Sequence, residues 1–332
     1  MRFLLSLIAC LTLTFAQTRP KINAVVSAAD FRPGVTFSGY ATIFGAGLSD
    51  GEYKAQTVPY PPKLGSTQVF FCYSTPVPVS ADIVTFLGCI PTSLVYASPS
   101  QINFLIPAAL TTPPKLVGLD GRNLFVVSVG GVIDQDASVT APNTYQLQSP
   151  QPRIFSMGTD CLIDPRYQNR STVCGLTFDA LSGNRADRGA ITDPQGNVIT
   201  SSNPAKLGGS YSIWLTGMGT FQNGKPPVAP AMLITNIPVY GYPGDTWMTA
   251  NLDYVGASSQ YPGLYQINFK LPVTIATSDP NWHGYPPPFP CGNYNWEVSL
   301  DLSQGSGYSS NHANLVQIPI VLKSGELPCV AP

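Results

Sequence analysis

One short pattern occurs twice in this chain and constrains its fold more than any other feature. The pattern QINF-x-[Ile/Leu]-Pro spans residues 101–107 and again residues 266–272. In both copies apolar residues alternate with polar or variable ones, which is the period of a half-buried β-strand. The alternation directs Ile102, Phe104 and Ile106 toward a core. A proline then ends each strand, because it cannot donate a ladder hydrogen bond.

The second copy repeats the inward residues as Ile267, Phe269 and Leu271. The apolar face is therefore kept while the opposite face varies, as a core strand requires. We expect the Gln and Asn of the pattern to hydrogen-bond to neighbouring loops or backbone; ligand binding is the less favoured alternative.

Another pair of segments extends the repeat. Residues 40–48 align with residues 211–218 when Phe44 is set against Trp214 and Gly47 against Gly217. In both segments a strand leads into a glycine-containing turn, and the QINF phrase follows at nearly the same distance. A duplicated domain explains this order and spacing.

Short alternating or apolar runs, bounded by Pro and Gly, continue along the chain. Charged residues are 11% of the chain, against about 25% in an average protein, and prolines number 33. The runs predict strands at 22–27, 40–44, 67–71, 83–86, 94–97, 101–106, 124–129, 190–192, 198–200, 211–215, 247–252, 264–271, 296–302 and 315–322. Asp193 to Asn197 (DPQGN) predicts a hairpin turn. We therefore predict an all-β fold of two tandem immunoglobulin-like β-sandwiches.

The N-terminus indicates export. Arg2 precedes an apolar run at 3–15 and the small residue Ala16, which is the layout of a secretory signal peptide, residues 1–16. The run is too short for a membrane span, and no other segment has about 20 unbroken apolar residues. A lipobox at Cys10 is a less favoured alternative. We expect an extracellular or cell-surface location, with the periplasm as the alternative.

Removing residues 1–16 leaves six cysteines, and in an exported chain an even number favours disulfides. Of the fifteen pairings of six cysteines, we prefer the sequential one: Cys72–Cys89, Cys161–Cys174 and Cys291–Cys329. Zinc is a weaker interpretation, because the chain has no CxxC motif and His283 and His312 are its only histidines.

Four phrases resemble a known family. Residues 22–48 (INAVVSAADFRPGVTFSGYATIFGAGL), 94–107 (LVYASPSQINFLIP), 188–219 (RGAITDPQGNVITSSNPAKLGGSYSIWLTGMG) and 261–272 (YPGLYQINFKLP) look like the large family of secreted proteins of soil Acidobacteria, the Solibacter type. Its members carry domains of the immunoglobulin-like E-set, or IPT/TIG, group. The resemblance implies a fold and a compartment but no reaction. The cysteine pairs, an insertion at 160–187 and a tail at 276–332 depart from the family pattern.

We predict a sandwich at residues 20–147 and a second at 148–332, the latter with an N-terminal insertion and a disulfide-bound C-terminal extension. The favoured function is a non-catalytic structural, adhesion or binding module whose partner is an extracellular protein or a polysaccharide. An alternative is a carbohydrate-binding module that uses aromatic residues of segment 279–296. Its candidate binding residues are Trp282, Tyr285, Phe289, Tyr294 and Trp296. The rival interpretation is that these rings fill one end of the second sandwich.

No motif specifies catalysis, a metal or a cofactor. The glycines at 45, 47 and 51 faintly resemble a dinucleotide loop, but the spacing is GxGxxxG and no helix-forming run follows, so a turn is favoured. Neither histidine lies in a GxSxG or HExxH context. A hydrolase with an Asp-based site is the second alternative. Asp134 and Asp136 are weak calcium candidates, and the sequence has no basic patch for nucleic acid.

Overall fold

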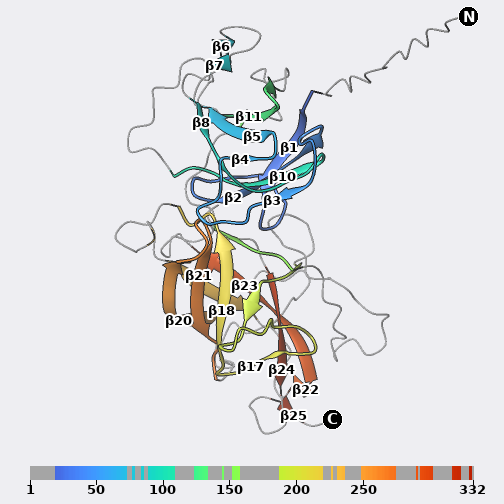
Figure 1. The fold of residues 1–332 in the computed structure, drawn as a ribbon. Coiled ribbons are helices and arrows are strands. Elements are labelled where there is room, and N and C mark those ends of the chain that lie inside the picture. Colours follow the sequence, from blue (N-terminus) through green and yellow to red (C-terminus); the bar gives the residue numbers. More distant parts are fainter. Residues whose placement is uncertain are drawn as a thin grey trace, which may run out of the picture.

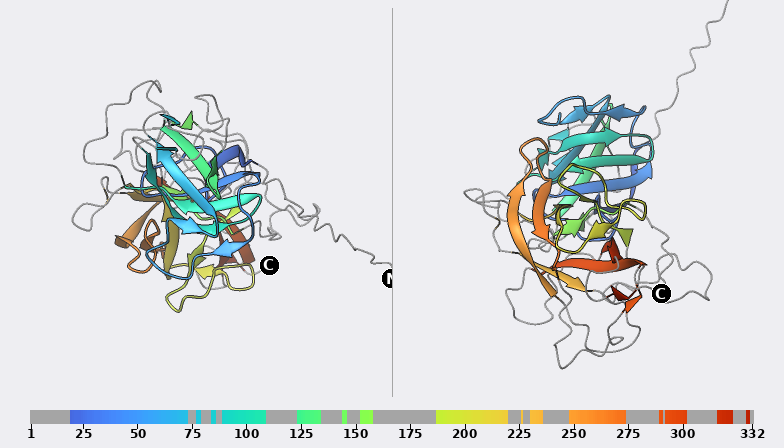
Figure 2. Two further views of the ribbon diagram at one scale, coloured as in Figure 1. Left: turned by 45° about the horizontal axis from the view of Figure 1, so that its top comes forward. Right: turned by 90° about the horizontal axis from the view of Figure 1, so that it is seen from below.

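The computed structural model describes residues 19–72, 77–78, 84–85, 89–108, 123–133, 144–145, 152–157, 187–219, 226, 230–235, 248–273, 289–290, 292–301, 316–322 and 329–330. These residues form strands and turns, and no helix occurs among them. The predicted all-β class is therefore confirmed. Within the same residues there is no helical segment with the length and apolarity needed to cross a bilayer. The strands gather in two lobes that lie end to end (Figures 1 and 2).

The first lobe is sandwich-like, with two main sheets. One sheet has the order β1-β2-β10-β9-β3, and the other has the path β12-β11-β5-β4, with β13 added to β11 and β8 to β5. A separate pair is formed by β6 and β7. The strands are β1 (Lys21–Ser27), β2 (Tyr40–Ala46), β3 (Tyr53–Lys54), β4 (Lys63–Leu64), β5 (Thr67–Cys72), β6 (Val77–Pro78), β7 (Val84–Thr85), β8 (Cys89–Pro91), β9 (Ser93–Ala97), β10 (Gln101–Leu105), β11 (Asn123–Val129), β12 (Val132–Ile133) and β13 (Thr144–Tyr145).

Side chains from both sheets meet in the core of the first lobe. Ile102 and Phe104 of β10 are fully buried, as are Phe71 of β5 and Phe125 of β11. The rings of Phe104 and Phe125 contact each other with their centroids 5.4 Å apart. Each such side chain contributes about 1.5–3 kcal/mol through burial. The predicted inward face of the first QINF strand is thus confirmed.

The second lobe is built on one continuous sheet. Its path is β14-β18-β21-β20-β19-β23-β24-β15, with β16 added to β18 and β17 to β24, and β22 pairs separately with β25. The strands are β14 (Arg153–Ile154), β15 (Asp187–Arg188), β16 (Ile191–Thr192), β17 (Ala205–Lys206), β18 (Ser210–Thr216), β19 (Ala231–Thr235), β20 (Met248–Ala257), β21 (Tyr265–Lys270), β22 (Phe289–Pro290), β23 (Gly292–Asp301), β24 (Val316–Leu322) and β25 (Cys329–Val330).

The long strand β20 connects the two halves of that sheet. Its first residues pair with β19 and its later residues pair with β21, with a bulge between Leu252 and Tyr254. A strand that bends in this way lets the two halves enclose one core. Ile267 and Phe269 of β21 enter this core, and Val298 of β23 enters it from the other half; all three are fully buried. The inward face of the second QINF strand is confirmed as well.

Two local predictions have opposite outcomes. The hairpin turn at 193–197 is confirmed, because Gly196 donates its N–H to the carbonyl of Asp193 and has a φ of 83°. The strand predicted at 198–200 is wrong. Val198 makes one bridge to Thr192, and the chain then enters a second turn, in which the Asn203 N–H bonds to the Thr200 hydroxyl at 3.0 Å. Turn-forming Ser and Asn residues outcompete the short apolar run there.

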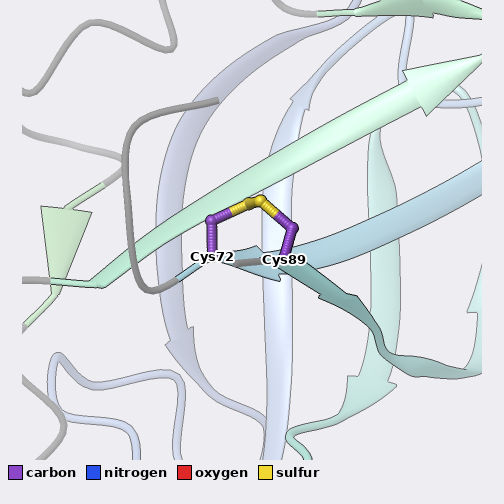
Figure 3. Close-up of a disulfide and its surroundings, with 2 residues drawn as sticks. All are labelled: Cys72 and Cys89. Atoms are coloured by element: carbon purple, nitrogen blue, oxygen red, sulfur yellow. A yellow bond between two sulfur atoms is a disulfide. The ribbon is translucent and has the colours of Figure 1, made fainter. Parts of the chain in front are cut away.

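The first predicted disulfide is confirmed. Cys72 and Cys89 face each other on the paired strands β5 and β8 and are joined by a disulfide, with their Cα atoms 3.9 Å apart (Figure 3). Cys161, Cys174 and Cys291 lie outside the described residues. The backbone of β25, which contains Cys329, runs parallel to β22, and Phe289 lies opposite Cys329. The pairing of the other four cysteines remains a prediction.

Candidate functional site

The two QINF strands occupy equivalent positions in the two lobes. Gln101 of β10 pairs with Phe44 of β2, and Gln266 of β21 pairs with Trp214 of β18. Two residues further along each QINF strand, Asn103 lies opposite Thr42 and Asn268 lies opposite Ser212. The alignment of Phe44 with Trp214, made from the sequence, therefore coincides with the backbone register.

The third strand of each lobe extends this correspondence. Asn103 pairs with Tyr96 of β9, and Asn268 pairs with Tyr254 of β20. In each lobe a bulge directly precedes the tyrosine, so the extra residue is Val95 in β9 and Asp253 in β20. The three-strand units β2-β10-β9 and β18-β21-β20 thus have the same order, register and bulge position.

Polar side chains on the outer faces of these units form matching networks. In the first lobe Asn103 Oδ1 accepts hydrogen bonds from the Thr42 hydroxyl at 3.0 Å and from Gln101 Nε2 at 2.8 Å. In the second lobe Asn268 Oδ1 accepts them from the Ser212 hydroxyl at 2.9 Å and from Gln266 Nε2 at 2.7 Å.

The prediction that the Gln and Asn side chains bond to loops or backbone is therefore wrong. Their partners are each other and a hydroxyl of the adjacent strand. The aligned Thr42 and Ser212 were a readable signal for this network, because both carry hydroxyls at matching positions. A shared Oδ1 acceptor fixes the orientation of each amide, and this leaves its Nδ2 group directed elsewhere.

The outer faces differ in how much of them is open to solvent. In the first lobe Tyr40 and Leu105, at one end of the face, contact the second lobe. In the second lobe the corresponding positions are Ser210 and Lys270, both exposed. The second copy thus presents the open version of the shared face. We call Trp214, Tyr254, Gln266 and Asn268 the amide–aromatic face.

Tyr254 lies flat across this face because Gly256, two residues further along β20, has no side chain. A Cβ at Gly256 would collide with the hydroxyl and Cζ of Tyr254, so the ring covers that glycine. Gly256 pairs with Gln266, which pairs with Trp214. The two aromatic residues therefore flank Gln266 in one row. In the first lobe the residue opposite Gln101 is Ser98, whose N–H and hydroxyl both bond to the Gln101 carbonyl.

A second cluster of functional groups joins the two lobes. The Thr216 hydroxyl accepts a hydrogen bond from the N–H of Tyr40 at 2.9 Å and donates one to the carbonyl of Gly263 at 2.9 Å. Gly263 has a φ of 81°, and a Cβ there would collide with Leu105 of the first lobe. The close approach of the lobes at this point requires glycine.

An ion pair lies at the same interface. Arg153 Nη1 is 3.2 Å from Asp30 Oδ2, and the Asp30 side chain is only 5% exposed. Arg153 Nη2 also donates to the carbonyl of Pro33 at 3.3 Å. Burial raises the pKa of Asp30 above its usual value, and the nearby Arg153 charge opposes that rise.

Aromatic rings complete the interface. The Tyr40 ring packs edge-on against Phe155 of the second lobe, with their centroids 6.2 Å apart, and shares a 3.0 Å hydroxyl hydrogen bond with Tyr60. Burial, followed by the bond to Tyr60, raises the pKa of the Tyr40 phenol above its usual range. Tyr40 therefore stays neutral and contributes packing.

The predicted aromatic segment is only partly described. Trp282 and Tyr285 lie outside the described residues, and Phe289 is in β22. Tyr294 and Trp296 occupy positions of β23 that pair with Ile320 and Ile318 of β24, two fully buried residues. The grouping of all five residues stays a prediction.

The remaining predicted features are the calcium and histidine candidates and the glycine loop at 45–51. Asp134, Asp136, His283 and His312 lie outside the described residues. The turn interpretation of the glycine loop is confirmed, because Gly47 has a φ of 62° and no helix follows within 48–54. Across the residues that are described, His, Cys, Asp and Glu do not gather in a group able to hold a metal.

A scan of the chain against protein-family models finds no match, and a search of the curated proteins also finds none.

Proposed function

We propose that this protein is an exported, non-catalytic binding module of two tandem immunoglobulin-like β-sandwiches, residues 20–147 and 148–332, that binds an extracellular partner through its surface. The observation that carries the proposal is the repeated three-strand unit. The same three-strand framework occurs twice with the same register, which supports a scaffold role for it. The two copies differ in their exposed side chains. Function in such a protein is expected where the copies differ.

The lobe interface supports the same proposal. The Thr216 hydroxyl fixes one lobe against the other by bonding to Tyr40 and Gly263. The ion pair between Arg153 and the buried Asp30 adds a second contact between the lobes. A fixed arrangement reduces the entropy lost when both lobes bind one partner. The disulfide at Cys72 is compatible with an oxidising compartment outside the cytoplasm. Signal-peptide cleavage after Ala16 is tested by sequencing the mature N-terminus, which should be Gln17.

The functional proposal is tested by measuring binding and turnover on the same purified protein, residues 17–332. Immobilised polysaccharides and extracellular proteins provide the binding panel, and a broad glycoside and ester panel provides the substrates. We expect saturable binding to at least one panel member and no turnover. Catalytic turnover that a carboxylate substitution abolishes would overturn the proposal in favour of the hydrolase alternative.

A further inference from the structure

We propose that the amide–aromatic face of the second lobe binds a neutral polysaccharide chain. This inference rests on the proposed function and gives it a location and a ligand class. The site consists of Trp214 on β18, Gln266 and Asn268 on β21, and Tyr254 on β20. The predicted aromatic segment 279–296 forms no part of it.

The arrangement of the rings fits sugar rings. Trp214 and the Tyr254 ring over Gly256 flank Gln266 in one row of paired residues, two strand spacings apart. Adjacent strands are about 4.8 Å apart, so the two ring positions are separated by roughly 10 Å, about the length of a disaccharide unit. The C–H face of a sugar packs on an aromatic ring with little loss of side-chain entropy, since such side chains have few rotatable bonds.

The amides between the rings have free hydrogen-bonding capacity. Within the described residues Asn268 Oδ1 accepts two hydrogen bonds, whereas its Nδ2 group donates none and Gln266 Oε1 accepts none. Both atoms lack a hydrogen-bond partner in that part of the chain, and neither belongs to the buried side-chain atoms that lack one. Solvent therefore reaches both atoms. An uncharged donor and an uncharged acceptor, held on two neighbouring outward positions of β21 by the bond between the two amides, suit the hydroxyl groups of a glycan.

The surroundings favour a neutral ligand over a charged one. Lys270 and Asp253 are exposed near the face, and their opposite charges offset each other. Tyr254 is 45% exposed although it is a large aromatic residue, so contact with a ligand ring would remove apolar surface from water. In the first lobe the matching face is partly covered by the second lobe, which restricts the inference to the second copy.

Affinity gel electrophoresis of the mature protein tests the inference. The neutral probes are hydroxyethylcellulose, xyloglucan, galactomannan and laminarin, and the acidic probes are alginate and polygalacturonate. We expect retardation by at least one neutral polysaccharide. Tyr254→Leu keeps apolar bulk without the ring and should weaken that binding about tenfold. Asn268→Asp keeps the Oδ acceptor but removes the free N–H donors, and it should weaken binding by a similar factor.

Phe31→Ala is the matched control, because it removes a ring that is 58% exposed from the first lobe and should leave binding unchanged. Thermal unfolding of every variant checks folding, and Trp214→Phe provides a further test if another variant fails to fold. Trp214→Phe should reduce the fluorescence change caused by the polysaccharide. Binding only to acidic probes, or to none of the six, overturns the inference. Neutral-polysaccharide binding that survives Tyr254→Leu and Asn268→Asp also overturns it, whereas the proposed binding function would then stand.

Discussion

Replacing Thr216 with valine nearly preserves the volume of the side chain and removes a hydroxyl that bonds to backbone groups of both lobes. Thr216 is 1% exposed, and its hydroxyl bonds to the Tyr40 N–H and the Gly263 carbonyl, each at 2.9 Å. Valine leaves both backbone groups without this partner at the interface. An unsatisfied buried group costs about 1–3 kcal/mol, and both of these groups are partly buried, so we take about 1–1.5 kcal/mol for each of the two.

We therefore expect Thr216→Val to lower the free energy of unfolding by about 2–3 kcal/mol, which corresponds to a fall of roughly 4–10 °C in Tm. Urea titration at 25 °C and scanning calorimetry on the mature protein measure these two quantities. Thr57→Val is the control, because Thr57 is exposed and its substitution should change stability by less than about 0.5 kcal/mol. If Thr216→Val is as stable as its control, the reasoning about the interface is refuted.

Three further experiments test separate contacts. Arg153→Met leaves the buried Asp30 carboxylate without its cation and should cost about 3 kcal/mol at pH 7. Burial raises the pKa of Asp30 above 3.8, so its contribution to stability falls as pH rises from that value through the folded pKa. Because Arg153→Met raises that pKa further, the drop in stability between pH 4 and pH 7 should grow; an unchanged pH dependence in urea titrations would contradict this. Replacing both Cys72 and Cys89 with serine opens a loop with a sequence separation of 17 and should cost about 3 kcal/mol in urea titration; an effect below about 1 kcal/mol would count against a stabilising disulfide. Gly263→Ala should destabilise more than Gly196→Ala in thermal unfolding, because the φ angles are 81° and 83° but only a Cβ at 263 would collide with other atoms; equal effects would count against close lobe contact.

Strand periodicity predicted much of the fold. The inward residues of both QINF strands follow directly from an alternation that needs no knowledge of the partner strand. The pairing of Cys72 with Cys89 was also predicted, since these two are consecutive among the six cysteines that remain after residues 1–16. Two-residue strands such as β14 and β17 were not predictable, because so short a segment has no period to detect.

The lobe interface was beyond sequence reasoning for a different reason. Tyr40 and Thr216 are 176 positions apart, and nothing local to either residue identifies the other. The amide network could more nearly have been predicted, because the aligned residues Thr42 and Ser212 each carry a side-chain hydroxyl. The Tyr254 ring can lie flat only because residue 256 is a glycine. A glycine within a strand indicates that some group packs closely against it, but the sequence does not show that this group is the Tyr254 ring.

The claim that the two lobes form one rigid unit is tested most directly by a distance measurement between them. Spin labels at Glu52→Cys in the first lobe and Gln195→Cys in the second occupy exposed positions that take no part in the interface contacts described above. Pulsed electron resonance of the doubly labelled protein should give a single narrow distance distribution. The same labels in a Gly263→Ala background should give a broader one. A broad distribution in the protein without Gly263→Ala would contradict the rigid arrangement.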